Sequence, residues 1–144
     1  MTQGAPPGIL GLANPSGWMN SKLFVDVMKH FIKFSNSSIE NLSILIYDNH
    51  ESHVTYQVVQ LAKDNGVIIL TLPPHCSNKL QPLDVSIFSP FKAYYNAGID
   101  SWLLNHPGKP ISIYQIAQCV GEAHMKALTP TNILSGFNKT EFFP

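Results

Sequence analysis

The sequence has 144 residues, enough for one domain, and 44% of them are hydrophobic, as expected for a chain with a globular core. Nine basic and nine acidic side chains cancel, so no global positive field draws the chain onto nucleic acid, and any DNA contact has to be local. Two cysteines, Cys76 and Cys119, are too few for a disulfide framework or a zinc site, and the absence of a membrane-length apolar run or a signal peptide predicts an intracellular, soluble chain.

The chain opens with a segment rich in glycine, proline and small residues. We expect residues 1–17 to be an extended lead-in without a core of its own. A helix should follow, with Asn20 as its N-cap. Apolar residues then recur at helical spacing, which predicts one face packed in a core: Leu23, Phe24, Val27, Met28, Phe31 and Ile32.

Two short apolar runs predict buried strands over 42–47 and 67–72. Between them we expect a helix capped by Ser52 and ended by Gly66. Its inward residues should be Val54, Val58, Leu61 and Ala62. A strand, a helix and a strand within about 30 residues make a right-handed βαβ unit, so the two strands should be parallel neighbours.

The second half of the chain is predicted to be helical. Pro82 suits the first position of a helix, which places Asp84 in its first turn, and Pro90 should kink or split that helix. Residues 111–128 predict another helix, and residues 129–144 are expected to be irregular.

Asp48 and Asp84 are the candidate functional residues. Asp48 follows the strand over 42–47 directly, and it can simply begin a turn or cap the next helix. Asp84 can simply favour the positive end of its helix. Both, however, are expected at the carboxyl edge of the parallel strand pair, where ligands bind in open α/β sheets. Two carboxylates there can hold divalent metals for phosphoryl transfer.

The sequence motifs around Asp48 and Asp84 are more specific than the spacing of the two residues. "LIYDNHESH", "LPPHCSNKLQPLDVSIFSPFKAYY" and "NPSGWMNSKLF" resemble the DDE superfamily endonuclease domain of Tigger/pogo-type transposases and of their relatives, the jerky proteins and centromere protein B. The resemblance covers roughly 4–144 and implies a ribonuclease-H-like α/β fold, a mixed sheet flanked by helices. It implies that Asp48 and Asp84 are the second and third catalytic carboxylates and metal ligands, with Asn49 and His53 supporting them. It also implies Mg²⁺ or Mn²⁺ as cofactor, DNA as partner, and a nuclear location, with no membrane and no small-molecule cofactor.

The same resemblance places a first catalytic aspartate on a strand ahead of the Gly/Pro-rich segment. Before Asp48, only Asp26 and Glu40 are acidic, and neither follows a strand in the right order. We therefore expect a C-terminal part of the fold, with its first strands missing. Its divisions would be a lead-in over 1–17, a partial endonuclease-like core over 18–106, and a helical segment and tail over 107–144.

With Asp48 and Asp84 present and the first catalytic aspartate missing, two functions are possible. One is a catalytically inactive, transposase-derived domain that binds nucleic acid or protein. The other is an active metal-dependent endonuclease or transposase, if the full protein supplies the first aspartate. A chain with only two parallel strands should also be marginally stable and prone to associate through an unpaired strand edge.

Other chemistries are weaker in this sequence. His50 and His53 could bind a metal, but their spacing across a strand-to-helix turn gives poor geometry. A haloacid-dehalogenase-like nucleophile would need an aspartate at position 50, which is histidine. A Ser-His-Asp triad stays open, although no nucleophile-elbow glycines flank a serine.

Overall fold

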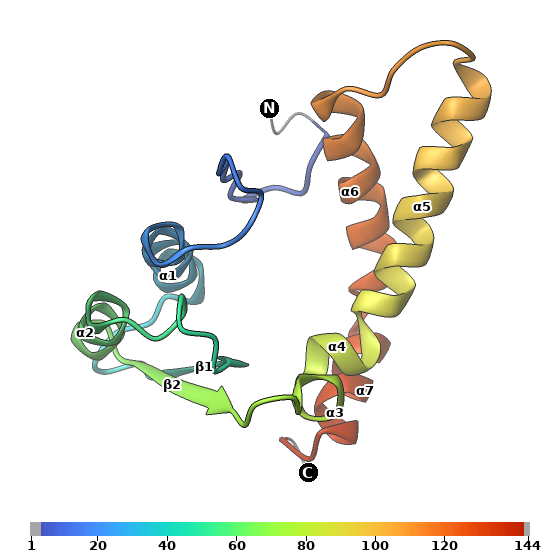
Figure 1. Ribbon diagram of the computed structural model, residues 1–144. Coiled ribbons are helices and arrows are strands. Elements are labelled where there is room, and N and C mark those ends of the chain that lie inside the picture. Colours follow the sequence, from blue (N-terminus) through green and yellow to red (C-terminus); the bar gives the residue numbers. More distant parts are fainter. Residues whose placement is uncertain (1–3, 143–144) are drawn as a thin grey trace. The chain divides into compact units, whose positions relative to one another are not determined.

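The computed structural model describes residues 4–142, and its contacts separate two compact units, which we describe one at a time. The sheet unit is Leu12–Ser77, and the helical unit joins Met1–Gly11 to Asn78–Pro144. The elements in chain order are α1 (Ser21–Ser35), β1 (Ser43–Asp48), α2 (Tyr56–Asp64), β2 (Val67–Leu72), α3 (Ser77–Leu80), α4 (Pro82–Ser86), α5 (Phe88–Asn105), α6 (Ile113–Ala127) and α7 (Pro130–Lys139) (Figure 1).

The sheet unit is built on the predicted βαβ arrangement. β1 and β2 pair in parallel, in a register that sets Ser43 opposite Val67 and Asp48 opposite Leu72. Helix α2 connects them. The structure confirms the α/β class, the parallel pair and the order of elements, and it makes Asp48 the last residue of its strand.

Helices α1 and α2 cover one face of this two-stranded sheet. Asn20 caps α1 as predicted, since its Oδ1 accepts the Leu23 amide at 2.9 Å. The buried cluster joins both helices to the sheet and consists of Phe24, Met28, Tyr47, Val58, Ala62 and Val67. On the strands, side chains alternate between the two faces. Ile44 and Ile68, paired in the register, stay 61% and 48% exposed, so the other face of the sheet carries apolar surface.

The start of α2 differs from the prediction. Thr55, not Ser52, is the N-cap: its Oγ1 accepts the Val58 amide, and the helix begins at Tyr56. Val54 therefore precedes the helix and is exposed rather than packed inward. The end of the helix is as expected, because Gly66 follows its C-cap with φ +67°. A side chain at Gly66 would also collide with the backbone of the 38–39 turn, so this position requires glycine.

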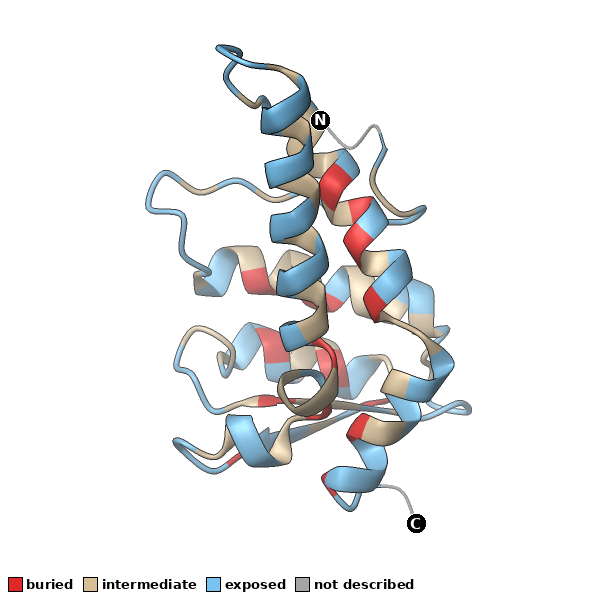
Figure 2. Cartoon of the chain, turned by 90° about the vertical axis from the view of Figure 1, so that its right-hand side faces the viewer, coloured by how far each residue is buried: buried red, intermediate tan, exposed pale blue. Residues whose placement is uncertain are grey.

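The helical unit contains two close helix pairs. α5 and α6 run against each other where Gly98 meets the Cys119 side chain, and Figure 2 shows the buried positions along α6. α4 and α7 form the second pair. The prediction of an irregular segment over 129–144 is wrong for residues 130–139, which form α7. Thr129 caps that helix and Pro130 occupies its first turn.

Two further positions shape the helical unit: the break between α4 and α5, and the contact of the N-terminal segment with α6. The predicted break near Pro90 falls at Ile87, which ends α4 and precedes α5, and Pro90 sits in the first turn of α5, where a missing amide is tolerated. Gly121 lies against the backbone of Gly4, so the N-terminal segment packs directly on α6. These contacts make the unit discontinuous in sequence.

Candidate functional site

The candidate site begins with Asp48, the last residue of β1. Its Oδ1 lies 2.8 Å from Nδ1 of His53 and accepts the His50 amide at 3.3 Å. A carboxylate only accepts hydrogen bonds, so Nδ1 of His53 must carry a proton in this arrangement. Half of the Asp48 side chain remains exposed, against 19% of that of His53. One carboxylate oxygen is thus oriented by the histidine while the group still faces solvent.

His53 is itself fixed by the core. Its ring stacks on Phe24 with centroids 4.3 Å apart, and it meets Tyr47 edge-on at 5.8 Å. The Tyr47 hydroxyl donates to the His53 carbonyl at 3.3 Å, and burial raises the pKa of that phenol. The contact of His53 with Asp48 therefore rests on buried aromatic packing.

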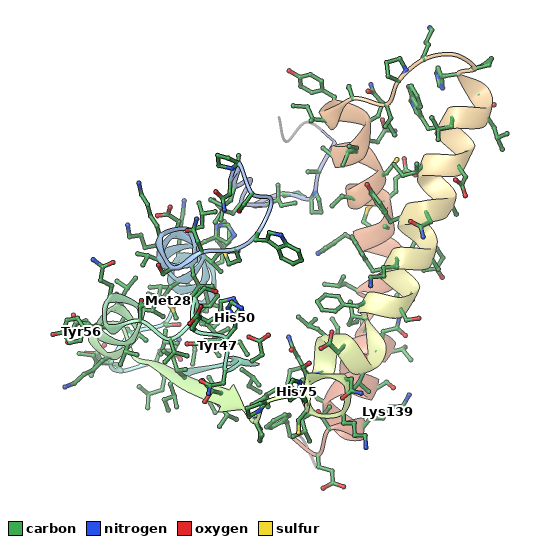
Figure 3. All side chains as sticks on the ribbon, viewed as in Figure 1. Met28, Tyr47, His50, Tyr56, His75 and Lys139 are labelled. Carbon is green, nitrogen blue, oxygen red and sulfur yellow. The ribbon has the colours of Figure 1, made fainter. Side chains whose placement is uncertain are left out.

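The other predicted residues lie on the exposed side of Asp48. Nδ1 of His50 lies 2.8 Å from Oγ of Ser52, and Asn49 is exposed at the end of the strand. Nδ1 of His50 and Nδ1 of His53 each have a hydrogen-bonding partner, so only Nε2 of either ring is left for a further ligand. Figure 3 labels His50 in the segment after β1 and His75 in the segment after β2.

Two cavities of the sheet unit meet at Asp48 and His50. One, of about 290 Å³, is lined also by Asn49 and by the 73–77 segment after β2. The other, of about 390 Å³, is lined by Trp18, Met19, Asp48, His50, Ser52 and His53. The sequence prediction did not include Trp18. The signal that could have found it is a large aromatic residue set among turn-forming residues just ahead of a helix.

Asp84 belongs to the helical unit. It lies in the first turn of α4, as predicted. This short helix is held by α7: Oγ of Ser86 donates to the Asn132 carbonyl at 2.7 Å, and Gly136 packs on the backbone of Pro82. A five-residue helix is unstable alone, so α7 fixes the part of the chain that carries Asp84. The sequence prediction missed this role of α7.

The carboxylates among the described residues are the type of ligand that a divalent metal binds, but too few of them lie together to hold one. Carboxylate oxygens are the ligands that Mg²⁺ and Mn²⁺ prefer. Across residues 4–142, however, no three histidine, cysteine, aspartate or glutamate side chains are grouped so that they could hold an ion. Asp48 and Asp84 each supply one carboxylate from a different unit.

Comparison with known families fits this arrangement. The model of the DDE superfamily endonucleases matches residues 3–137. The chain belongs to this family. The parallel strands with their flanking helices are consistent with part of the ribonuclease-H-like fold of a DDE endonuclease, whose members use divalent metals.

The chain is also similar to a protein of Cochliobolus lunatus named MFS-type transporter clz9. The two are 32% identical over 130 residues, which covers 90% of this chain but 14% of that protein. The name describes the longer protein. Within residues 4–142 of the present chain, every helix is too short or too polar to cross a membrane. No solved structure matches the chain.

Proposed function

We propose that this chain is a transposase-derived, Tigger/pogo-type DDE endonuclease-like domain that binds DNA. In this proposal, Asp48 and Asp84 share one site, with Asn49 and His53 supporting them. The observation that carries it is Asp48 at the carboxyl end of a parallel strand, oriented by His53 inside a chain matched by the endonuclease family over residues 3–137.

DNA is the partner that the family favours, and the charge balance limits how it can be bound. With nine basic and nine acidic side chains, attraction to phosphates has to come from a few lysines near the contact. We therefore expect weak binding with a shallow dependence on salt concentration, since each phosphate contact adds about one to the slope of log K against log salt. A highly basic DNA-binding domain would show a much steeper slope.

We further propose that the polypeptide of this sequence does not cleave DNA. Asp48 and Asp84 give a metal two carboxylates, and the family resemblance implies a third, which would bridge two ions. Loss of one member of a catalytic group removes most of the activity. The alternative is an active metal-dependent endonuclease or transposase in a longer protein that supplies the missing aspartate.

The test combines a binding and a cleavage measurement on the purified chain. Fluorescence anisotropy with a labelled duplex, repeated over a salt series, measures binding. Incubation of plasmid DNA with Mg²⁺ or Mn²⁺ measures cleavage. We expect weak, salt-sensitive binding and intact DNA. Cleavage that is lost in both Asp48→Ala and Asp84→Ala, but retained in Asp100→Ala, would show an active site and overturn the proposed inactivity. Absence of DNA binding at low salt would contradict the proposed partner.

Two finer points belong to the same proposal. The divisions at 17/18 and 106/107 stay predictions, which limited proteolysis followed by mass spectrometry can test. A nuclear location follows from the family type alone, and microscopy of the tagged chain is its measurement.

A further inference from the structure

We propose that Trp18 is a stacking platform for an unpaired nucleobase at the edge of the Asp48 cavity. This inference rests on the proposed DNA function, and it names the form of DNA that the site takes: a strand with at least one base out of the duplex.

The first observation is the exposure of Trp18. Its side chain is 80% exposed, the second most exposed of the large hydrophobic residues of the sheet unit after Tyr56. Indole carries a large apolar surface, so a flat partner that covers this ring gains favourable burial. Tyr56 has a hydroxyl for solvent and lies at the start of α2, away from the cavity lining.

The second observation is a set of hydrogen bonds that holds the backbone at Trp18 in place. Nδ2 of Asn14 donates to the Trp18 carbonyl at 2.6 Å and to Oγ of Ser16 at 2.8 Å. Oγ of Ser16 in turn accepts the Trp18 amide at 3.3 Å, and the Gly17 amide donates to the Asn14 carbonyl at 2.9 Å. Asn20 then starts α1 two residues later. The backbone on both sides of Trp18 is therefore held, so binding at this residue has less backbone freedom to remove.

The third observation is location. Trp18 and Met19 line the same cavity, of about 390 Å³, as Asp48, His50 and His53. A base stacked on the indole would lie in the same cavity as Asp48, the proposed catalytic carboxylate. The platform and the candidate catalytic residue thus belong to one surface of one unit.

The chemistry of the lining favours a base over a phosphate. The lining residues include a carboxylate, two histidines and two apolar side chains, but no lysine or arginine. Such a surface offers a phosphate little attraction, whereas every base has a π-face that stacks on an aromatic ring independently of sequence. An unpaired base is required because bases in a duplex are already stacked on their neighbours.

The experiment uses the two tryptophans of the chain separately. In Trp102→Phe, the remaining fluorescence reports Trp18; in Trp18→Phe, it reports Trp102, which stacks on His106 in the helical unit and is the matched control. The probe is a ten-residue thymidine oligonucleotide, compared with an oligonucleotide of the same length made of abasic sites. Emission and anisotropy are followed during titration at low salt, with circular dichroism as the check on folding.

We expect the thymidine oligonucleotide to quench Trp18, the abasic one to leave it unchanged, and Trp102 to respond to neither. Trp18→Ala should weaken binding by about 5- to 150-fold, the range that base–aromatic stacking supplies, and Trp18→Phe should retain most of it. If wild type binds DNA and a folded Trp18→Ala binds equally well, the inference is wrong while the proposed function stands. Quenching by the abasic strand, or a blue shift of Trp18 emission with protein concentration alone, would also overturn it. No DNA binding by any form would refute both.

Discussion

Gly136→Ala should destabilise the helical unit although it replaces glycine by the best helix former. A Cβ atom at this position would lie 2.5 Å from Oγ of Ser86 and 2.7 Å from the Pro82 carbonyl oxygen, so α4 and α7 would have to separate. Overpacking of this kind costs about 1–3 kcal/mol. Losing the hydrogen bond from Ser86 to Asn132 adds about 1 kcal/mol, and the higher helix propensity of alanine returns about 1 kcal/mol. The net loss is about 1–3 kcal/mol.

The assay is urea unfolding in a Trp18→Phe background, so that Trp102 fluorescence reports the helical unit. With an m-value near 2 kcal/mol per M, the midpoint should fall by about 0.5–1.5 M. Gly98→Ala in α5 is the matched control: its Cβ would lie 3.5 Å from Sγ of Cys119, an ordinary contact, so it should be neutral or stabilise by up to about 1 kcal/mol. Equal stability of Gly136→Ala and Gly98→Ala would refute the close α4–α7 contact.

Three other outcomes test the core, the thiols and the unpaired edge of β1. Met28→Ala should lower the free energy of unfolding by about 2–5 kcal/mol because Met28 is fully buried. Met125 is 72% exposed, so Met125→Ala should change that free energy by about 0.5 kcal/mol or less, and similar losses in thermal unfolding would contradict the assigned core. Burial, and to a lesser extent the Glu122 carboxylate, raise the pKa of the Cys119 thiol, so less of its thiolate is present at a given pH. Iodoacetamide should therefore label the half-buried Cys76 before the buried Cys119, and mass spectrometry measures the order of labelling. The unpaired edge of β1 should make the chain associate, and Ile44→Lys, which adds a charge to that edge strand, should shift light scattering toward monomer; unchanged scattering would contradict association through this strand.

The sheet unit was predictable because its signals are local. The apolar runs around Asp48 and Gly66 have the length of buried strands, and the turn chemistry between them favours one connection. The error at Ser52 has a specific cause: Ser52 and Thr55 could both cap α2, and Oγ of Ser52 bonds to His50 instead. Which hydroxyl becomes the cap depends on the packing of the preceding turn, which local preferences do not determine.

The helical unit was less predictable because the formation of α7 and its packing on α4 depend on tertiary contacts. Thr129 followed by Pro130 is a recognisable start of a helix, but Gly136 in so short an apolar pattern favours a break. That glycine is required by the approach of α4, not by a turn. Likewise, nothing local in the sequence indicates that Gly4 packs on α6. The proposed pairing of Asp48 with Asp84 rests on strand order and family resemblance, whereas the contact of Asp48 with His53 depends on the path of the chain after β1, which local sequence does not determine.

The most direct test of the shared site is cross-linking between positions 48 and 84. A double variant with Asp48→Cys and Asp84→Cys, in a background where Cys76 and Cys119 are serine, is treated with a short bismaleimide and mapped by mass spectrometry. Asp64→Cys with Asp84→Cys is the matched pair, because Asp64 ends α2 and so lies toward the opposite edge of the parallel sheet. We expect an intramolecular link between 48 and 84 and none between 64 and 84. Efficient linking of 64 to 84 without linking of 48 to 84 would show that the two carboxylates do not form one site.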